Sequence, residues 1–283
     1  MNAPVRAEPR FADYAAQGYV WPLRAMHAAE AETAYRRFLA HWNHNIDRFA
    51  GSLPRERIWL TIDTHLSLPW VSDLASHPQV LDAVEKVLGP DVLIWNTHWF
   101  PKFPGDRSFV SWHQDATYWG LKPPQVTTAW IALMPSTREN GCLEVMPGSH
   151  LGDLMPQRET YAEDNMLSRG QEIAVEIDPA RTLSLELKPG EFSLHHIGIA
   201  HGSGPNESDT PRIGLAVRYV APEVVQAGPY RDLAVLARGE DRHGNFDLVA
   251  PPTREWGLDE ESLQRLSLSR KLDNNATRAG PPK

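Results

Sequence analysis

The sequence predicts a mainly β protein, a sandwich or barrel flanked by helices. Beyond residue 90, seven short segments rich in β-branched and aromatic residues are separated by Gly, Pro or Asn, as strands of such folds are. Before residue 90, apolar residues instead recur every three or four positions, which is helical spacing. The 283 residues suit one large domain, and no internal repeat is visible, so we expect a single catalytic domain over 1–283.

The N-terminal part of the chain is expected to be helical. Residues 1–10 resemble a loose tail, and 11–23 a short docking segment that ends in an apolar run. Helical spacing of apolar residues predicts one helix over 25–48 and a second over 70–88, which stops at a Gly-Pro pair. We therefore take 11–90 as an N-terminal helical region.

The strand-rich core is expected over 91–222. A polar segment at 151–181 interrupts it and is too long for a plain hairpin loop, so we expect a lid or substrate loop there. Residues 223–283 read as a partly ordered C-terminal extension with a disordered tail at 271–283. The seven predicted strands lie in DVLIWNTHWF (91–100), FVSWHQD (109–115), VTTAWIALM (126–134), GCLEVMP (141–147), TLSLELK (182–188), EFSLHH (191–196) and RIGLAVRYV (212–220).

Composition excludes two classes of partner. The net charge is −8, whereas surfaces that bind polyanions normally carry a basic excess, so we expect no nucleic-acid partner. No apolar run of about eighteen residues is present, so we expect no membrane span, and the first residues lack the apolar core of a secretory signal. The one cysteine, Cys142, is expected to be a buried small hydrophobe in a cytoplasmic protein.

His113 and Asp115 form the strongest local signal for chemistry. Side chains two apart on a strand point to the same face, so an imidazole and a carboxylate could reach one metal ion. His201, at the end of a later strand, can supply a third ligand. Two histidines and one carboxylate leave coordination positions open and suit non-haem iron(II). The alternative is a hydrogen-bonded surface pair, because the His-x-Asp pattern also occurs by chance.

Arg212 follows His201 by eleven residues, on the next predicted strand. A guanidinium there could bind a carboxylate through two hydrogen bonds, and the alternative is an exposed strand arginine. His195 and His196 are the rivals of His201 for the third ligand. His201 is preferred because it alone has the spacing to Arg212, and His150 receives no metal role.

With these residues in hand, the chain resembles the phytanoyl-CoA dioxygenase family of Fe(II)- and 2-oxoglutarate-dependent dioxygenases. The resemblance covers roughly residues 11–222. Four motifs carry it in the expected order: WHQD at 112–115, TTAWIAL at 127–133, ENGCLEVMPGSH at 139–150 and HGSGPNESDTPRIGLAVRY at 201–219.

The resemblance implies a double-stranded β-helix (jelly-roll, cupin-like) core and the cofactors Fe(II), 2-oxoglutarate and O2. It implies His113, Asp115 and His201 as iron ligands. It places Arg212 on the far carboxylate of 2-oxoglutarate, with Ser203 close by, and Gln114 between the ligands at the cofactor site. Related halogenases carry a small residue in place of the carboxylate ligand, so Asp115 disfavours halogenation.

Four further residues are candidates for a substrate pocket. Trp119 lies beside the metal motif and could shape an aromatic pocket, although core packing is the alternative. Lys102 could bind an anionic group, or it could be a solvated loop lysine. His98 and Asn96 alternate on one strand and could line the cavity, and His98 could equally be a core histidine with satisfied hydrogen bonds.

The implied function is hydroxylation of an unactivated C–H bond in a small organic substrate, with release of succinate and CO2. The alternative is a non-oxygenase, cupin-like metal-binding jelly roll or an isomerase, which would need neither Arg212 nor Ser203. We see no concentrated basic patch for a coenzyme A diphosphate, so an amine, an amino-acid derivative or a secondary metabolite is favoured over an acyl-CoA. A homodimer is left open.

Overall fold

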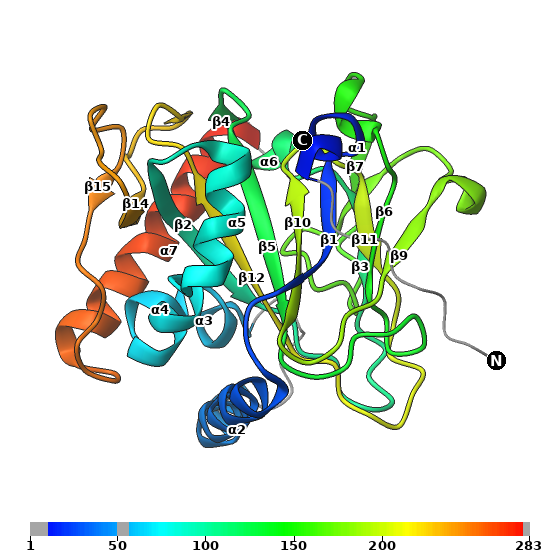
Figure 1. Ribbon diagram of the computed structural model, residues 1–283, viewed down its shortest axis with the longest axis horizontal. Coiled ribbons are helices and arrows are strands. Elements are labelled where there is room, and N and C mark those ends of the chain that lie inside the picture. Colours follow the sequence, from blue (N-terminus) through cyan, green and yellow to red (C-terminus); the bar gives the residue numbers. More distant parts are fainter. Residues whose placement is uncertain (1–10, 50–56, 280–283) are drawn as a thin grey trace.

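Two β-sheets face each other and form the jelly-roll core that the resemblance implies (Figure 1). The computed structural model describes residues 11–49 and 57–279. The larger sheet has the strand order β1-β10-β5-β12-β2-β14-β15, and the smaller has the order β3-β11-β6-β9. Their strands are β1 (Tyr19–Arg24), β2 (Val92–Trp99), β3 (Val110–His113), β5 (Val126–Ala132), β6 (Leu143–Val145), β9 (Leu183–Leu185), β10 (Glu191–His196), β11 (His201–Ser203), β12 (Gly214–Val220), β14 (Leu233–Arg238) and β15 (Asp247–Leu248).

Each of the seven predicted segments contains one of these strands, so the predicted fold class is confirmed. The larger sheet also takes β1, β14 and β15 from outside 91–222. β1 pairs antiparallel with β10 and forms one edge of the sheet. The segment at 11–23 thus joins the sheet, whereas the expected tail at 1–10 lies outside the described residues.

Strand β12 shows how the sheet separates a core face from a site face. Leu215, Val217 and Tyr219 are fully buried in the core that the larger sheet shares with the helices. Ala216 and Arg218 have the opposite parity and point between the two sheets, as successive side chains on a strand must. Because Arg218 is a charged side chain on an otherwise apolar strand, the space between the two sheets is a candidate functional site.

Helices from the N-terminal part of the chain cover the outer face of the larger sheet (Figure 1). The predicted helix at 25–48 is α2 continued by one 3-10 turn, η2, and it starts where Glu30 accepts a hydrogen bond from the His27 N–H at 2.8 Å. The described helices are η1 (Phe11–Asp13), α1 (Tyr14–Gln17), α2 (Ala28–Asn45), η2 (Ile46–Phe49), α3 (Ile58–Thr61), η4 (Thr64–Leu66), α4 (Pro69–Ala75), α5 (Pro78–Leu88), α6 (Ala116–Trp119), η5 (Ser149–Leu151), η6 (Pro179–Arg181) and α7 (Leu258–Ala279).

The prediction of a single helix over 70–88 was wrong. The segment forms two helices, α4 and α5, which are separated by Ser76 and His77. Pro78 has no N–H to continue the hydrogen-bond ladder of α4, and it fits the first turn of a new helix instead. The His77 ring accepts a hydrogen bond from the N–H of Gln79 at 3.3 Å and so caps α5.

The prediction of a disordered tail was also wrong for 271–279, which belong to helix α7. Several of its polar residues are buried rather than solvated: Lys271 is 8% exposed and Asn274 is fully buried. Asn274 donates a hydrogen bond to Asp232 at 2.9 Å, beside β14, so a polar composition here marks a buried polar interface. Residues 280–283 lie outside the described residues. None of the helices described is long and apolar enough to cross a membrane.

The segment at 151–181 contains structure of its own. Strands β7 (Gln157–Glu159) and β8 (Gln171–Ile173) pair as an antiparallel hairpin, which lies against β3. A second small pair joins β4 (Leu121–Lys122) to β13 (Val225–Gln226). The lid role of the first segment stays a prediction.

Candidate metal centre and adjoining pockets

His113, Asp115 and His201 converge between the two sheets. Their ligand atoms all lie within 4.8 Å of one another, and all three residues are buried. His113 and His201 pair directly across β3 and β11, and their ring centroids are 4.1 Å apart. Asp115 is not on the strand, as its spacing had suggested, but at the start of α6 with helical dihedral angles. The chain therefore turns between the two ligands and still brings the carboxylate to the histidines.

Backbone carbonyls orient both imidazoles. The carbonyl of Ser111 lies 2.8 Å from His113 Nδ1, and that of Ile199 lies 3.0 Å from His201 Nδ1. A carbonyl only accepts, so each Nδ1 carries a proton, and Nε2 is the ring atom left to bind a metal. The Nε2 atoms face Asp115, at 3.3 Å from His113 and 3.9 Å from His201.

The protonation states suit a divalent metal. Burial lowers the pKa of His201 to about 4, so its imidazole is neutral near pH 7. Burial by itself raises the pKa of Asp115, but the adjacent imidazoles of His113 and His201 outweigh burial and lower that pKa to about 2. Two imidazoles, of which His201 is neutral, and a carboxylate gather at one buried point with coordination positions left open, and this set fits Fe(II).

A narrow pocket leads from the triad to Arg212, which is 1% exposed and so is not the exposed strand arginine of the alternative. Arg212 donates to the carbonyls of Gly141 and Phe100, at 2.7 and 3.0 Å. It also donates to Ser203 Oγ at 3.2 Å, and its guanidinium lies 5.1 Å from the centre of the Trp130 ring. Burial lowers the pKa of Arg212 to about 10, which leaves the group cationic at neutral pH.

The pocket fits an elongated dicarboxylate such as 2-oxoglutarate. Among the described residues, Arg212 Nε, Thr128 Oγ1 and His195 Nδ1 are buried polar atoms without a hydrogen-bond partner. All three residues line the pocket. Unpartnered buried polar atoms are rare in native proteins, so their gathering along one channel indicates a polar ligand that bonds to them.

Lys102 and Gln114 lie elsewhere than the sequence suggested. Lys102 is fully buried, not a solvated loop residue, and it does not line the larger cavity described below. Its Nζ donates to the carbonyl of Ser203 at 3.1 Å and also to Ser203 Oγ and the Gly204 carbonyl, close to Arg212. Burial holds the pKa of Lys102 well below its usual range. Lys102 thus lies behind Ser203 and close to Arg212, but it does not line the narrow pocket.

Gln114 lies behind the triad, not in the cofactor pocket. Its Nε2 donates to the carbonyl of Gly198 at 2.7 Å, and its Oε1 accepts from the N–H of Met155 at 2.8 Å. Both ends of the amide are thereby used, and the side chain is fully buried. Gln114 connects the metal motif to the loop before β11 and to the segment at 151–181.

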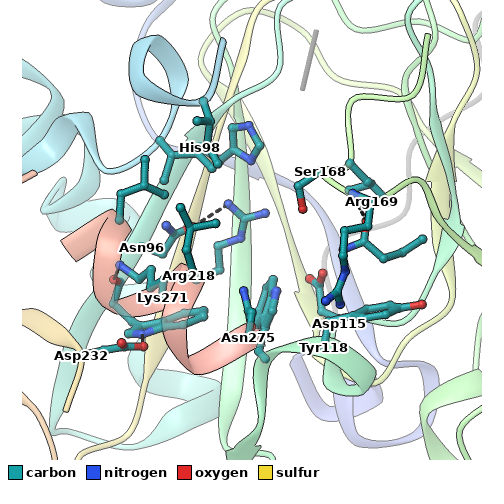
Figure 2. Close-up of a pocket in the computed structure, with 18 of the residues that line it drawn as sticks. Asn96, His98, Asp115, Tyr118, Ser168, Arg169, Arg218, Asp232, Lys271 and Asn275 are labelled. Atoms are coloured by element: carbon teal, nitrogen blue, oxygen red, sulfur yellow. Dashed lines mark hydrogen bonds between the residues drawn. The ribbon is translucent and has the colours of Figure 1, made fainter. Parts of the chain in front are cut away.

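A second, larger cavity of about 420 Å³ opens on the other side of Asp115 (Figure 2). Trp119, His98 and Asn96 line it, so the structure brings these three candidates together beside the metal site. Trp119 lies 5.2 Å from Trp95 between ring centroids. The wall opposite Asp115 comes from α7. Apolar residues of α7 and of 151–181 contribute to the lining: Met166, Leu167, Leu268 and Leu272.

Sequence reasoning missed Arg218 and the α7 residues in this cavity. Arg218 could have been found, because it shares strand parity with Ala216 and is the one charge in an otherwise apolar run. Lys271 could not, because nothing in a polar C-terminal sequence distinguishes a buried helix from a solvated tail. Of the rival histidines, His195 lies beside His201 at 4.9 Å between centroids without joining the triad, whereas His196 contacts His150.

Comparisons with known proteins identify the family of this chain. The family model for phytanoyl-CoA dioxygenase matches residues 14–214. A probable phytanoyl-CoA dioxygenase of Caenorhabditis elegans is 28% identical over 158 residues, 53% of this chain and 51% of that protein. A probable alpha-ketoglutarate-dependent hypophosphite dioxygenase of Stutzerimonas stutzeri is 29% identical over 177 residues, 61% of each chain. The chain thus spans half to three fifths of the length of these curated relatives.

Solved structures match over more of the chain. The non-heme monooxygenase ThoJ, in its apo form, is 32% identical with a TM-score of 0.81, covering 95% of this chain and 98% of that chain. CytC3 with Fe(II) and alpha-ketoglutarate has a TM-score of 0.61 at 24% identity, covering 87% of this chain and 94% of that chain, and shows the shared fold. The family model covers more than half of the sequence, and the chain belongs to the phytanoyl-CoA dioxygenase family.

Proposed function

We propose that this protein is an Fe(II)- and 2-oxoglutarate-dependent oxygenase that hydroxylates an unactivated C–H bond of a small organic substrate. The observation that carries the proposal is Arg212, a buried cation at the end of a pocket that starts at the metal triad. A metal-binding jelly roll or a cupin-like isomerase needs the triad but has no use for a buried guanidinium at that place. When bound by His113, Asp115 and His201, iron would supply the oxidative chemistry that couples O2 to 2-oxoglutarate decarboxylation.

Protein side chains at the far end of the pocket would position 2-oxoglutarate. Arg212 has its Nε free for a carboxylate oxygen, and a planar guanidinium matches a carboxylate with two hydrogen bonds. Ser203 donates its hydroxyl proton to the Gly141 carbonyl at 2.8 Å and accepts from Lys102 and Arg212, so it fixes both cations. These contacts hold the co-substrate in one orientation toward the triad.

The surroundings would keep bulk water from the reacting atoms. The pocket walls between the triad and Arg212 are largely apolar, and the metal ligands are each no more than 6% exposed. Excluding water strengthens every electrostatic contact inside and prevents side reactions. The larger cavity beyond Asp115 supplies the space for a substrate.

The test is succinate release from 2-oxoglutarate, measured with Fe(II) and after removal of iron by a chelator. The proposal predicts succinate only with iron and oxygen present, and a control with Asp115→Ala should release none. Iron binding without any succinate, over a broad metabolite panel, would favour the non-oxygenase alternative.

Product analysis decides the reaction type. Solved structures of similar fold include an alpha-ketoglutarate-dependent epimerase and a carbocyclase, at 21% and 22% identity, so the fold alone does not select hydroxylation. Incorporation of labelled oxygen from O2 into the product would support hydroxylation, and an unlabelled isomer or cyclised product would contradict it.

A homodimer has no support in the comparisons, and the cytoplasmic location stays a prediction.

A further inference from the structure

Arg218 occupies the junction between the two pockets. It lies on β12, is 8% exposed, and lines both the narrow pocket and the larger cavity. Figure 2 shows it between Asn96 and Lys271 on one side and Asp115 on the other. Its guanidinium lies 5.2 Å from the centre of the Trp119 ring, so aromatic and cationic groups share one wall of the cavity.

The charge of Arg218 has no counter-ion of its own. Its Nη1 donates to Asn96 Oδ1 at 2.9 Å, and its buried Nε has no hydrogen-bond partner. Within the described part of the chain, no carboxylate lies at ion-pair distance from this guanidinium. Asp115 and Asp63 are close enough to influence it electrostatically, but Asp115 is committed to the metal triad and Asp63 forms an ion pair with Lys271. A buried cation without a partner is costly to maintain, which indicates that an anion occupies the space beside it.

The other cations that line the cavity are already neutralised. Lys271 forms an ion pair with Asp63 at 2.6 Å, and Arg169 forms one with Glu159 at 2.9 Å. Asn96 donates to Asp63 at 2.7 Å, which fixes its amide so that its oxygen faces Arg218. Arg218 is therefore held by a rigid partner while its remaining donors stay available.

We propose that the substrate is an organic acid, that its carboxylate pairs with Arg218, and that its apolar body lies along the aromatic and aliphatic walls of the larger cavity. The inference rests on the proposed function, because it takes this cavity as the substrate site. A carboxylate fits because its two oxygens match two donors of one guanidinium. The carboxylates of 2-oxoglutarate do not meet this need in the proposed arrangement, since they are assigned to Arg212 and the metal.

The test compares matched acids and amides, which have nearly the same shape and differ in charge. Suitable pairs are phenylacetate with phenylacetamide, hexanoate with hexanamide, and decanoate with decanamide. Binding is measured by calorimetry on the anaerobic Fe(II)-loaded protein, with and without 2-oxoglutarate. At least one acid should bind the natural protein about ten- to a hundredfold more tightly than its amide, the value of one or two charge-assisted hydrogen bonds.

Arg218→Gln should abolish the preference for the acid, because it keeps a planar hydrogen-bonding group and removes the charge. Arg218→Lys should retain part of the preference, and Arg242→Gln, which removes an exposed charge outside both pockets, should retain all of it. Thermal unfolding of each variant checks that the fold is intact.

Two outcomes would overturn the inference: no acid binds the natural protein more tightly than its amide, or the preference survives intact in folded Arg218→Gln. The proposed function fails separately, if 2-oxoglutarate neither binds to the iron-loaded protein nor yields succinate. The acid–amide comparison without 2-oxoglutarate still tests Arg218 in that case.

Discussion

Replacing Lys271 by Met should destabilise the protein strongly, because it removes one partner of a buried ion pair. Lys271 Nζ donates to Asp63 Oδ2 at 2.6 Å, to Ser267 Oγ at 2.7 Å and to the Trp95 carbonyl at 3.0 Å. Asp63 is fully buried, so Lys271→Met leaves a carboxylate charge in the interior. Breaking such a pair from one side costs about 3–5 kcal/mol in the free energy of unfolding.

The loss should depend on pH. Burial raises the pKa of Asp63, but Lys271 and its neighbours outweigh burial and hold that pKa below the ordinary value of 3.8. Ionised Asp63 therefore stabilises the natural protein above that pH, and the contribution is lost as the pH falls through the folded pKa. In Lys271→Met, burial prevails and raises the pKa, so ionisation of Asp63 costs stability as the pH rises. The gap between the two proteins should be largest near neutral pH and narrow below about pH 4.

Urea unfolding of the natural protein and the variant, at neutral and acidic pH, measures this gap. Asp63→Asn combined with Lys271→Met is the matched control, because it removes the stranded charge and keeps the shape. The double variant should recover most of the lost stability at neutral pH. A neutral-pH loss under about 1 kcal/mol, or a double variant as unstable as the single one, would show that the stranded Asp63 charge is not the cause of the instability.

Three further predictions concern the site. Asp115→Ala should abolish succinate release and weaken iron binding, which metal analysis after dialysis detects; full activity would contradict the assignment of the ligand. Arg212→Lys keeps the charge but loses the two-pronged geometry, so titration should show about ten- to a hundredfold weaker 2-oxoglutarate binding with iron retained. Unchanged affinity in that variant and in Arg212→Ala would move the anchor to Lys102. Hydrogen exchange over 151–181 should slow when iron, 2-oxoglutarate and substrate bind, and strong protection already present in the apo protein would argue against a lid.

Local pattern was enough to predict the centre of the fold. Strands such as VTTAWIA are short runs of β-branched and aromatic residues bounded by turn residues. In the folded protein these runs form strands, as their local sequence predicts. His113 and His201 could be paired from the sequence alone, because both follow strand-like runs and Arg212 comes after the second. The alternation of side chains on the strand RIGLAVRYV would also have predicted that Arg218 points to the same face as Ala216, between the two sheets.

The sequence did not predict which polar residues are buried by segments that lie far away in the chain. Lys102 reads as a loop lysine, and only the approach of Ser203 and Gly204 from another strand shows that it is buried near Arg212. Helix α7 reads as a solvated tail because its buried face is polar. Its partner Asp63 lies about two hundred residues earlier in the chain, a distance over which a local pattern carries no signal.

Anaerobic titration of 2-oxoglutarate into the Fe(II)-loaded protein is the most direct test of whether the triad and Arg212 form a 2-oxoglutarate-dependent oxygenase site. We expect a metal-to-ligand absorption band that saturates at one 2-oxoglutarate per chain, and that is weaker in Asp115→Ala because this variant binds iron less tightly. Admission of oxygen should then convert the bound 2-oxoglutarate to succinate. If iron binds to the triad but 2-oxoglutarate produces neither the band nor succinate, the protein is not a 2-oxoglutarate-dependent oxygenase.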